Sequence, residues 1–144
     1  MAIKTEAIGK EWPATTYEVG KEKVGEYARV VGLENPVHFD REAAKAAGYR
    51  DVVAPPMFAV VYSSRAIFPA LFDPEVGIDF ARMVHGAQRF EWHEPVTAGD
   101  EITTEAEHES SQERGALTFH VFTTRSTNQH VELVCEGRWT NVVR

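Results

Sequence analysis

The chain has 144 residues, of which 43% are hydrophobic and 26% are charged. This composition excludes a disordered or low-complexity protein, because it supplies enough apolar surface to offset the entropy of ordering the chain. The length fits one domain over residues 1–144. The net charge of −7, without a local cluster of Lys and Arg, argues against nucleic acid as a partner.

Cysteine use and hydropathy indicate a soluble protein. Cys135 is the sole cysteine, so it forms neither an internal disulfide nor a cysteine-based zinc site, which suits a reducing compartment. The N-terminal residues lack the apolar run of a signal peptide. The most apolar stretch, residues 52–62, contains Pro55 and Pro56 and is shorter than the roughly 20 residues that cross a bilayer. We predict a cytoplasmic protein with no membrane contact.

The first elements in chain order are a short strand and a helix. Residues 15–19 form a β-prone run. Apolar side chains recur at helical spacing over residues 21–31, and Gly32 follows where a helix would end. The spacing predicts an amphipathic helix.

A turn and a second helix come next. Pro36 disfavours helical geometry at Asn35 and predicts an extended or turn conformation there. Asp40 then stands where it can cap a short helix over residues 41–47, which Gly48 closes.

Residues 57–72 predict a long helix with apolar side chains in almost every direction. Such a helix is expected to be enclosed rather than to lie on a surface, and its ordinary role is core rather than cofactor binding. Pro69 is expected to kink or end its last turn.

Four long β-prone segments fill the second half of the chain. Turn-forming residues separate them, which predicts an antiparallel meander. Alternation of apolar and polar side chains over residues 117–123 indicates one face packed on apolar material, and the preceding helix supplies that material. The predicted fold class is therefore α+β. The segments are residues 84–94, 101–113, 116–127 and 131–143.

Three segments of the sequence, residues 27–40, 42–44 and 90–100, resemble the MaoC-like (R)-specific enoyl-CoA hydratases, whose hot-dog fold wraps a curved antiparallel sheet around a long apolar helix. Residues 27–40 (YARVVGLENPVHFD) are similar to the hydratase signature, in which an aromatic residue leads through Gly-Asp-x-Asn-Pro to an aliphatic residue and a histidine. The match continues in residues 42–44 and 90–100, so it spans nearly the whole chain. It implies a hot-dog domain that acts on acyl thioesters of coenzyme A or acyl carrier protein.

Two further segments resemble one branch of this family, the actinobacterial fatty-acid-synthase-like dehydratases. They are residues 17–24 (YEVGKEKV) and residues 53–58 (VAPPMF). This branch includes the paired subunits of mycobacterial 3-hydroxyacyl dehydratases. The resemblance therefore implies a homodimer, or a heterodimer with a homologous hot-dog subunit.

His38 stands at the position of the family histidine. In the resembling hydratases an Asp and a His activate the water that adds to the β-carbon of an enoyl thioester, or collect it in the reverse reaction. Imidazole suits this proton transfer because it titrates near neutral pH. The resemblance implies a catalytic role for His38, although a lone His in a polar loop is ordinarily a bystander. Asn35 is expected to shape this catalytic loop through local backbone hydrogen bonds.

Leu33 departs from the family, which has its catalytic Asp at this position. Leucine neither holds water nor transfers a proton. Three interpretations stay open: Glu34 takes over the role, Asp40 does so from the far side, or this chain cannot complete the reaction alone. A solvated Glu34 is the ordinary interpretation of a carboxylate in a loop.

A second departure lies at the entrance of the central helix. The hydratases commonly carry His-Gly-Met there, whereas this chain has Pro55, Pro56 and Met57. The enolate oxygen that develops on the thioester needs donors, which backbone N–H groups at a helix N-terminus supply well. Pro56 has no N–H and is expected to give the helix a rigid start. The oxyanion donors would have to be Met57 or Phe58, whose N–H groups lie in the first turn.

We expect no metal and no redox cofactor. The remaining histidines lack the close spacing of a metal site, so surface or inter-strand positions are expected for them. Three arginines offer contacts to the phosphates of coenzyme A or a carrier's pantetheine arm, although Arg is common on any surface. The histidines are His85, His93, His108, His120 and His130, and the arginines are Arg50, Arg82 and Arg89.

Three functions stay open from the sequence. The first, motivated by His38, is reversible hydration and dehydration of enoyl and (R)-3-hydroxyacyl thioesters. The second, motivated by Leu33 and Pro56, is a non-catalytic substrate-binding subunit of a heteromeric dehydratase. The third is a hot-dog thioesterase. It ranks last because residues 57–72 contain no Asp or Glu to act as base or nucleophile.

Overall fold

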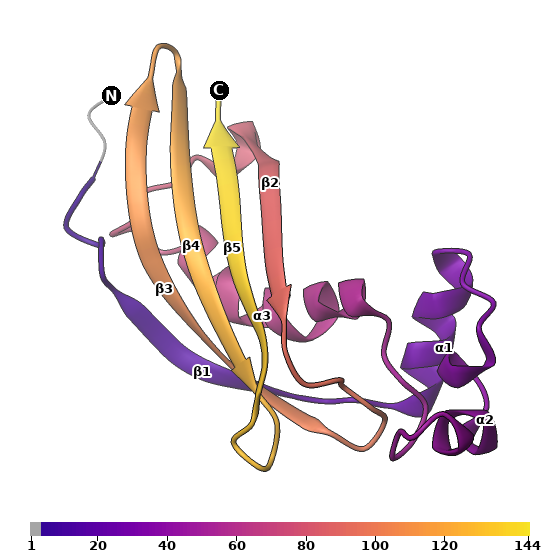
Figure 1. Ribbon diagram of the computed structural model, residues 1–144. Helices are drawn as coiled ribbons and strands as arrows, with labels where there is room; N and C mark the ends of the chain where they lie inside the picture. Colours follow the sequence, from indigo (N-terminus) through magenta and orange to yellow (C-terminus); the bar gives the residue numbers. More distant parts are fainter. Residues whose placement is uncertain (1–3) are drawn as a thin grey trace.

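A computed structural model, which describes residues 4–144, has a curved five-stranded antiparallel sheet packed against a helix (Figure 1). This arrangement confirms the predicted α+β class and hot-dog architecture. The strands are β1 (Glu11–Glu18), β2 (Met83–Trp92), β3 (Glu101–Arg114), β4 (Leu117–Thr127) and β5 (Leu133–Val143). The helices are α1 (Lys21–Val30), α2 (Arg41–Ala46) and α3 (Ala59–Leu71), with short 3-10 turns at Pro36–His38, Pro56–Phe58 and Phe80–Arg82.

The strand order is β1-β3-β4-β5-β2. Strands β3, β4 and β5 form the predicted meander, because short turns keep consecutive strands adjacent. The expectation that β2 belongs to this meander is wrong, since β2 pairs with β5 at the far edge. The connection over residues 93–100 is long enough to carry the chain from that edge to β3, which also pairs with β1.

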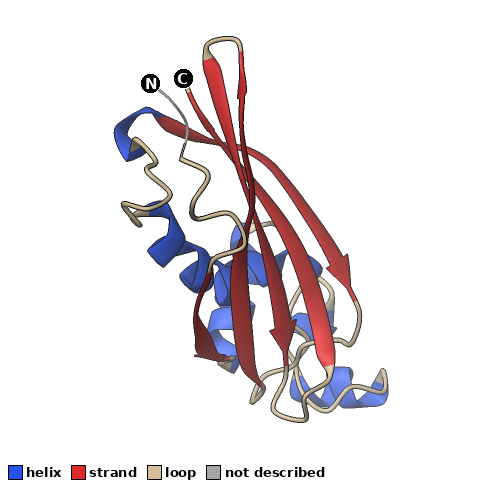
Figure 2. Ribbon diagram, turned by 90° about the vertical axis from the view of Figure 1, so that its left-hand side faces the viewer, coloured by secondary structure: helices blue, strands red, loops and turns tan. Residues whose placement is uncertain are grey.

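Helix α3 lies on one face of the sheet, as Figure 2 shows. Its inward side chains pack in two clusters. The expectation of a fully enclosed helix is corrected, because Phe68 is 53% exposed and the following Phe72 is 62% exposed. One cluster joins Phe58, Ala59 and Tyr62 to Val19, Ile102 and Val134, and the other joins Ala66, Ile67 and Ala70 to Trp12, Phe122 and Trp139.

The helix ends follow the predicted caps. The carboxylate of Asp40 accepts a hydrogen bond from the N–H of Glu42 at 2.9 Å and so begins α2. Gly48, with a φ of +96°, follows the end of α2 in the left-handed region that favours glycine. Pro69 lies in the last turn of α3, which ends at Leu71. No helix within residues 4–144 is long and apolar enough to span a membrane.

Candidate functional site

His38 lines a cavity of about 420 Å³ at the end of the sheet where α1 and α2 lie. Most of the wall comes from three parts of the chain. The loop after α1 gives Asn35 and His38, the segment before α3 gives Pro55 and Pro56, and the end of β2 with its following loop gives residues 92–96, while α3 and β5 also contribute. Residues far apart in the sequence therefore form one site.

The imidazole of His38 is held in one orientation. Its Nδ1 lies 2.7 Å from the carbonyl oxygen of Val53. A carbonyl only accepts, so Nδ1 carries the proton and donates it, which leaves the lone pair of a neutral imidazole on Nε2. The N–H of Val53 donates to the carbonyl oxygen of Val37 at 2.9 Å, so the loop is tied to Val53 twice. His38 thus keeps one nitrogen free to accept a proton.

Asn35 shapes this loop. Its Oδ1 accepts a hydrogen bond from the N–H of Val37 at 3.2 Å, which caps the 3-10 turn that ends at His38. Val37 directly precedes His38. Asn35 therefore acts on the site through the backbone that carries His38.

The carboxylates expected beside His38 lie elsewhere. Glu34 is exposed and is not on the cavity wall, and neighbouring Leu33 is 36% exposed. Asp40 is engaged as the cap of α2. Among the carboxylates of residues 4–144, Glu94 alone lines the cavity. Sequence reasoning missed Glu94, although it lies within the family-like residues 90–100.

The entrance of α3 leaves one free backbone donor. The N–H of Phe58 donates to the carbonyl oxygen of Pro55 at 2.8 Å, so the expectation that Phe58 donates to a substrate is wrong. Its ring is fully buried in the core. Pro56 has no N–H, and its carbonyl oxygen accepts from the indole of Trp92 at 2.7 Å. Within residues 4–144, the N–H of Met57 donates to no backbone or side-chain acceptor.

Tyr62 lines the cavity, and sequence reasoning did not identify it. Tyr62 follows Phe58 by one helical turn, which is the one sequence signal that could have found it. Burial raises the pKa of the Tyr62 phenol, and burial raises the pKa of the neighbouring Cys135 thiol to about 11. Both groups are neutral at ordinary pH. Cys135 is therefore not an activated nucleophile.

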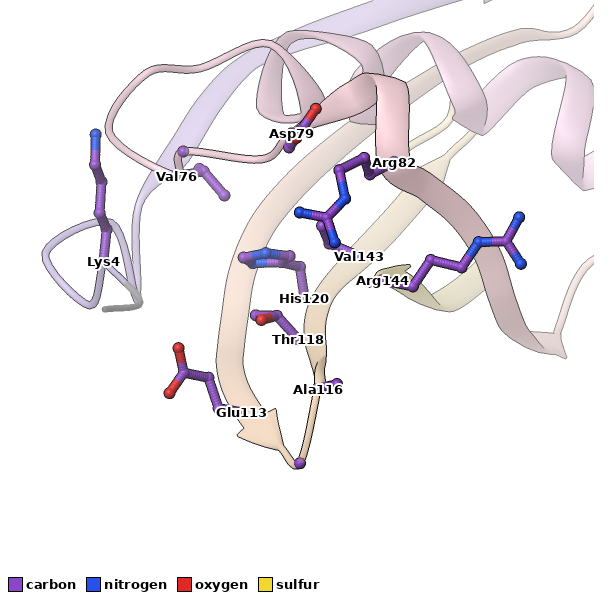
Figure 3. A pocket seen from close by; sticks show the side chains of 12 residues that line it. Lys4, Val76, Asp79, Arg82, Glu113, Ala116, Thr118, His120, Val143 and Arg144 are labelled. Carbon is purple, nitrogen blue, oxygen red and sulfur yellow. The ribbon is translucent and has the colours of Figure 1, made fainter. Parts of the chain in front are cut away.

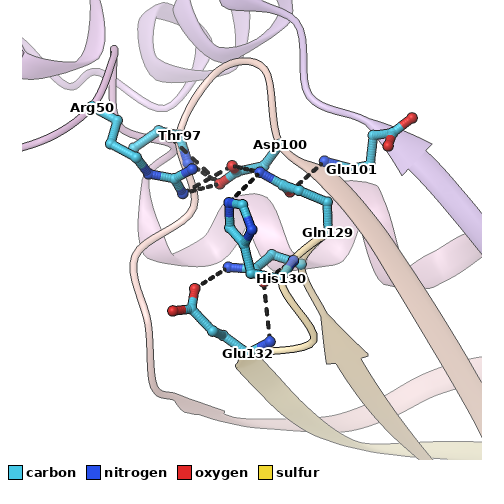
Figure 4. A network of polar contacts seen from close by, with 8 residues as sticks. Arg50, Thr97, Asp100, Glu101, Gln129, His130 and Glu132 are labelled. Atoms are coloured by element: carbon cyan, nitrogen blue, oxygen red, sulfur yellow. Dashed lines mark hydrogen bonds and ion pairs between the residues drawn. The ribbon is translucent and has the colours of Figure 1, made fainter.

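A network of polar contacts around the buried Asp100 supports the segment that holds His38 (Figure 4). Asp100 is 1% exposed and accepts from the N–H of Thr97 at 2.9 Å, from Gln129 at 3.0 Å and from Arg50 at 2.9 Å. Asp100 thereby stabilises the turn at residues 97–100. This turn holds the segment before α3, because the carbonyl of Val96 accepts from the N–H of Ala54 at 2.8 Å. Arg50 is thus committed to Asp100 rather than free for a phosphate.

The remaining histidines are partly exposed and partly buried. His85, His93 and His130 are exposed, as expected, but the surface alternative is wrong for His108 and His120, which are buried on the adjacent strands β3 and β4. Arg82 lines a separate cavity, and Arg89 is exposed on β2.

One trio offers metal-ligating atoms. Glu91, His93 and Glu136 place one donor atom each within 4.8 Å of one another, and His93 Nε2 lies 3.1 Å from a Glu136 carboxylate oxygen. Exposed groups of this kind are common without an ion. The absence of a metal cofactor stays a prediction.

Known proteins share this sequence and architecture. A UPF0336 protein of Saccharopolyspora erythraea is 41% identical over 145 residues, which cover 100% of this chain and 93% of that protein. The structure of a C-terminally truncated HadBC (3R-hydroxyacyl-ACP dehydratase) complex from Mycobacterium tuberculosis superposes with a TM-score of 0.85 and 31% identity, over 97% of this chain and 99% of that one.

A second solved structure, a MaoC-like dehydratase, gives a TM-score of 0.87 and 31% identity over 96% of this chain. The match covers 42% of that longer chain. The family model described as "FAS1-like, dehydratase domain region" matches residues 6–137. The chain therefore belongs to the FAS1-like dehydratase region family, within the hot-dog proteins that resemble MaoC.

Proposed function

We propose that this chain is the substrate-binding subunit of a hydratase or dehydratase of acyl thioesters, and that a homologous hot-dog subunit supplies the acid–base pair. The observation that carries this proposal is the placement of the carboxylates. Leu33 occupies the position of the family Asp, Glu34 is exposed, and Asp40 caps α2. Addition or loss of water needs an acid and a base within reach of one water. His38 on its own is half of that pair.

The cavity has the composition that an acyl thioester requires. Val53, Val96, Val134 and Tyr62 give it an apolar lining for an acyl chain. Met57 does not line the cavity, but it follows the cavity-lining Pro56, and its free N–H is the proposed donor for the thioester oxygen. Addition or loss of water at such a site moves only water and protons, so the proposed function calls for no redox cofactor.

An exposed apolar edge supports a hot-dog partner. Strand β2 ends the sheet and carries exposed Val84. Phe80, in the turn directly before β2, and Phe72, at the end of α3, are also exposed, and their ring centroids lie 4.6 Å apart. Together with Phe68 they leave apolar surface on one side of the molecule, which is typical of a protein–protein contact. The solved HadBC relative is itself named as a complex of subunits.

The decisive experiment compares the pure chain with its complex. The chain alone is incubated with crotonyl-CoA, and the absorbance of the enoyl thioester is followed. It is then co-purified with a MaoC-like subunit that carries both the Asp and the His of the signature. We expect no hydration by the chain alone, hydration by the complex, and no loss when His38→Ala is introduced in this chain. Hydration by the chain alone that disappears with His38→Ala would overturn the proposal.

A second candidate is a self-sufficient homodimeric hydratase with His38 as base. The observation that favours it is Glu94, whose carboxyl group shares the cavity with His38. Under this alternative the Glu94→Gln and His38→Ala variants of the isolated chain each lose activity. Under the subunit proposal the isolated chain has no activity for either variant to lose.

A further inference from the structure

A second cavity, of about 550 Å³ (Figure 3), lies at the end of the sheet where β3 turns into β4, away from the end where α1 and α2 lie (Figure 1). It is bordered by the turn between β3 and β4, the end of β5 and the 3-10 turn before β2. Its charged lining consists of Lys4, Asp79, Arg82, Glu113 and Arg144, and its other polar side chains are Thr118 and His120. The dehydratase chemistry proposed above uses none of these groups.

His120 is built into the wall of this cavity rather than laid on a surface. It is 4% exposed, and its Nδ1 lies 2.7 Å from the hydroxyl oxygen of Ser111. That oxygen lies 2.9 Å from Nε2 of His108, which is fully buried. The same Nε2 lies 3.1 Å from the carbonyl oxygen of Ser110. The four residues form one chain of hydrogen bonds that ends at the cavity.

The direction of this chain follows from its acceptors. The carbonyl of Ser110 lies 3.1 Å from Nε2 of His108 and only accepts, so the proton of a neutral His108 lies on Nε2. Ser111 accepts that proton's hydrogen bond and donates its own hydrogen to Nδ1 of His120. A neutral His120 therefore carries its proton on Nε2. This N–H has no partner within the described residues and belongs to a ring that lines the cavity.

Cationic and hydroxyl donors accompany this N–H. Figure 3 shows the guanidinium of Arg82 beside the His120 ring, with Thr118 on the same wall. Arg82 and Arg144 form no ion pair within residues 4–144, whereas Lys4 donates to the carbonyl of Pro74 at 2.7 Å. A guanidinium next to this N–H suits a planar or tetrahedral oxyanion.

We propose that this cavity is an anion site, in which His120, Arg82 and Thr118 bind a carboxylate or phosphate group of a small ligand. Its apolar side chains, Val76, Val143 and Ala116, leave room for an organic part of that ligand. The site is independent of the cavity that contains His38. Its failure would leave the proposed function untouched.

The test is a titration of the full chain with inorganic phosphate and, separately, with acetate, at constant ionic strength. Binding is read from the ring resonances of His120 by NMR and from calorimetry. We expect a saturable shift with at least one probe, and the two arms distinguish a phosphate site from a carboxylate site. Bound anion should also raise the pKa of His120, whereas the carboxylates of Asp79 and Glu113 on the same wall repel the anion itself.

Two matched variants decide between a site and a merely acidic or basic surface. Arg82→Gln should weaken binding about tenfold or more, whereas Arg89→Gln, the same charge change on exposed β2, should not. His120→Gln keeps a donor near the position of Nε2 and should retain binding that His120→Leu loses. No saturable shift with either probe, or equal affinity in the Arg82→Gln and Arg89→Gln variants, overturns the proposal. Because Arg82 is exposed, its variant tests the site even if His120→Leu fails to fold.

Discussion

The indole N–H of Trp92 donates to the carbonyl oxygen of Pro56 at 2.7 Å, and so joins the last residue of β2 to the entrance of α3. The two residues are far apart in the sequence and meet only because β2 lies at the edge of the sheet. Their bond orients the turn that carries the free N–H of Met57. The geometry of the candidate site therefore depends on where β2 pairs.

Replacing Trp92 with Phe tests this link. The variant keeps an aromatic ring and loses the hydrogen bond, which should lower the free energy of unfolding by about 1 kcal/mol. Trp139→Phe is the comparator, because its indole donates to the Thr124 hydroxyl at 3.0 Å in a buried place and should cost more. Urea denaturation of both variants measures the difference. A Trp92→Phe protein as stable as the wild type would show that this bond does not hold the entrance.

Replacements of His38 test whether its side chain anchors the loop. In His38→Asn the side-chain amide can still donate to the carbonyl oxygen of Val53. In His38→Ala the carbonyl oxygen of the buried Val53 loses this hydrogen bond. We expect the Asn variant to keep its stability within about 0.5 kcal/mol and the Ala variant to lose about 1 kcal/mol. Thermal and urea unfolding provide the measurement. Equal stability of the two variants would mean that Nδ1 does not anchor the loop.

Local chemistry explains which parts of this fold were predictable. The caps at Asp40 and Gly48 are set by neighbouring residues, so the observed α2 (Arg41–Ala46) ends within one residue of the predicted 41–47. The strand segments were likewise recognisable from alternation. The strand that pairs with β2 was not predictable, because the sequence does not indicate whether residues 93–100 form a tight turn or cross to another strand.

The residues of the candidate site divide in the same way, into those that a local motif predicts and those that the tertiary fold brings in. Asn35 and His38 lie in one short motif and were predicted together, with the geometry of their loop. Trp92, Glu94 and Tyr62 join them only through the tertiary fold. The helical spacing of Tyr62 from Phe58 and the family-like residues 90–100 are signals in the sequence, but neither shows that these residues face His38. Polar His120 was expected outside or between strands, and its burial depends on Ser111 of the neighbouring strand.

The Asp100 network should be a large contributor to stability. Asp100→Ala removes the acceptor of the Thr97 N–H and leaves a buried donor unpaired, which should cost about 3 kcal/mol. Arg50→Gln should cost less, about 1 kcal/mol, since the Arg50 side chain is 54% exposed and Gln129 still donates to the carboxylate. Urea denaturation ranks the two. The reverse order would mean that the arginine, rather than the backbone turn, depends on Asp100.

Stability should fall as the pH is lowered toward 4. Burial lowers the pKa of His120 from 6.5 to about 4, and nearby His108, whose pKa burial also lowers, adds to the effect. The unfolded chain then binds more protons than the folded one between these pH values, so acid favours unfolding. His120 by itself should account for about 3 kcal/mol of loss across this window.

Urea denaturation at pH 6.5 and pH 4 measures this loss, and His120→Gln should flatten it. Asp73 affects the pH dependence of stability only at a lower pH. The hydrogen bond from Lys10 holds the pKa of Asp73 below 3.8, so its contribution disappears only at a more acidic pH. A pH dependence identical in wild type and His120→Gln would contradict the assignment to His120.

Val131, in the turn between β4 and β5, adopts a φ of +61°, which β-branched residues strongly disfavour. The turn is fixed by Asn128, whose Oδ1 accepts from the N–H groups of His130 and Glu132. Val131→Asn relieves the strain without the flexibility of glycine, so it should raise the free energy of unfolding by about 1 kcal/mol. Val30→Asn is the matched control, because Val30 is 81% exposed and Val131 is 82% exposed, while Val30 is helical. If the two variants change stability equally, loss of exposed apolar surface rather than backbone strain accounts for the effect.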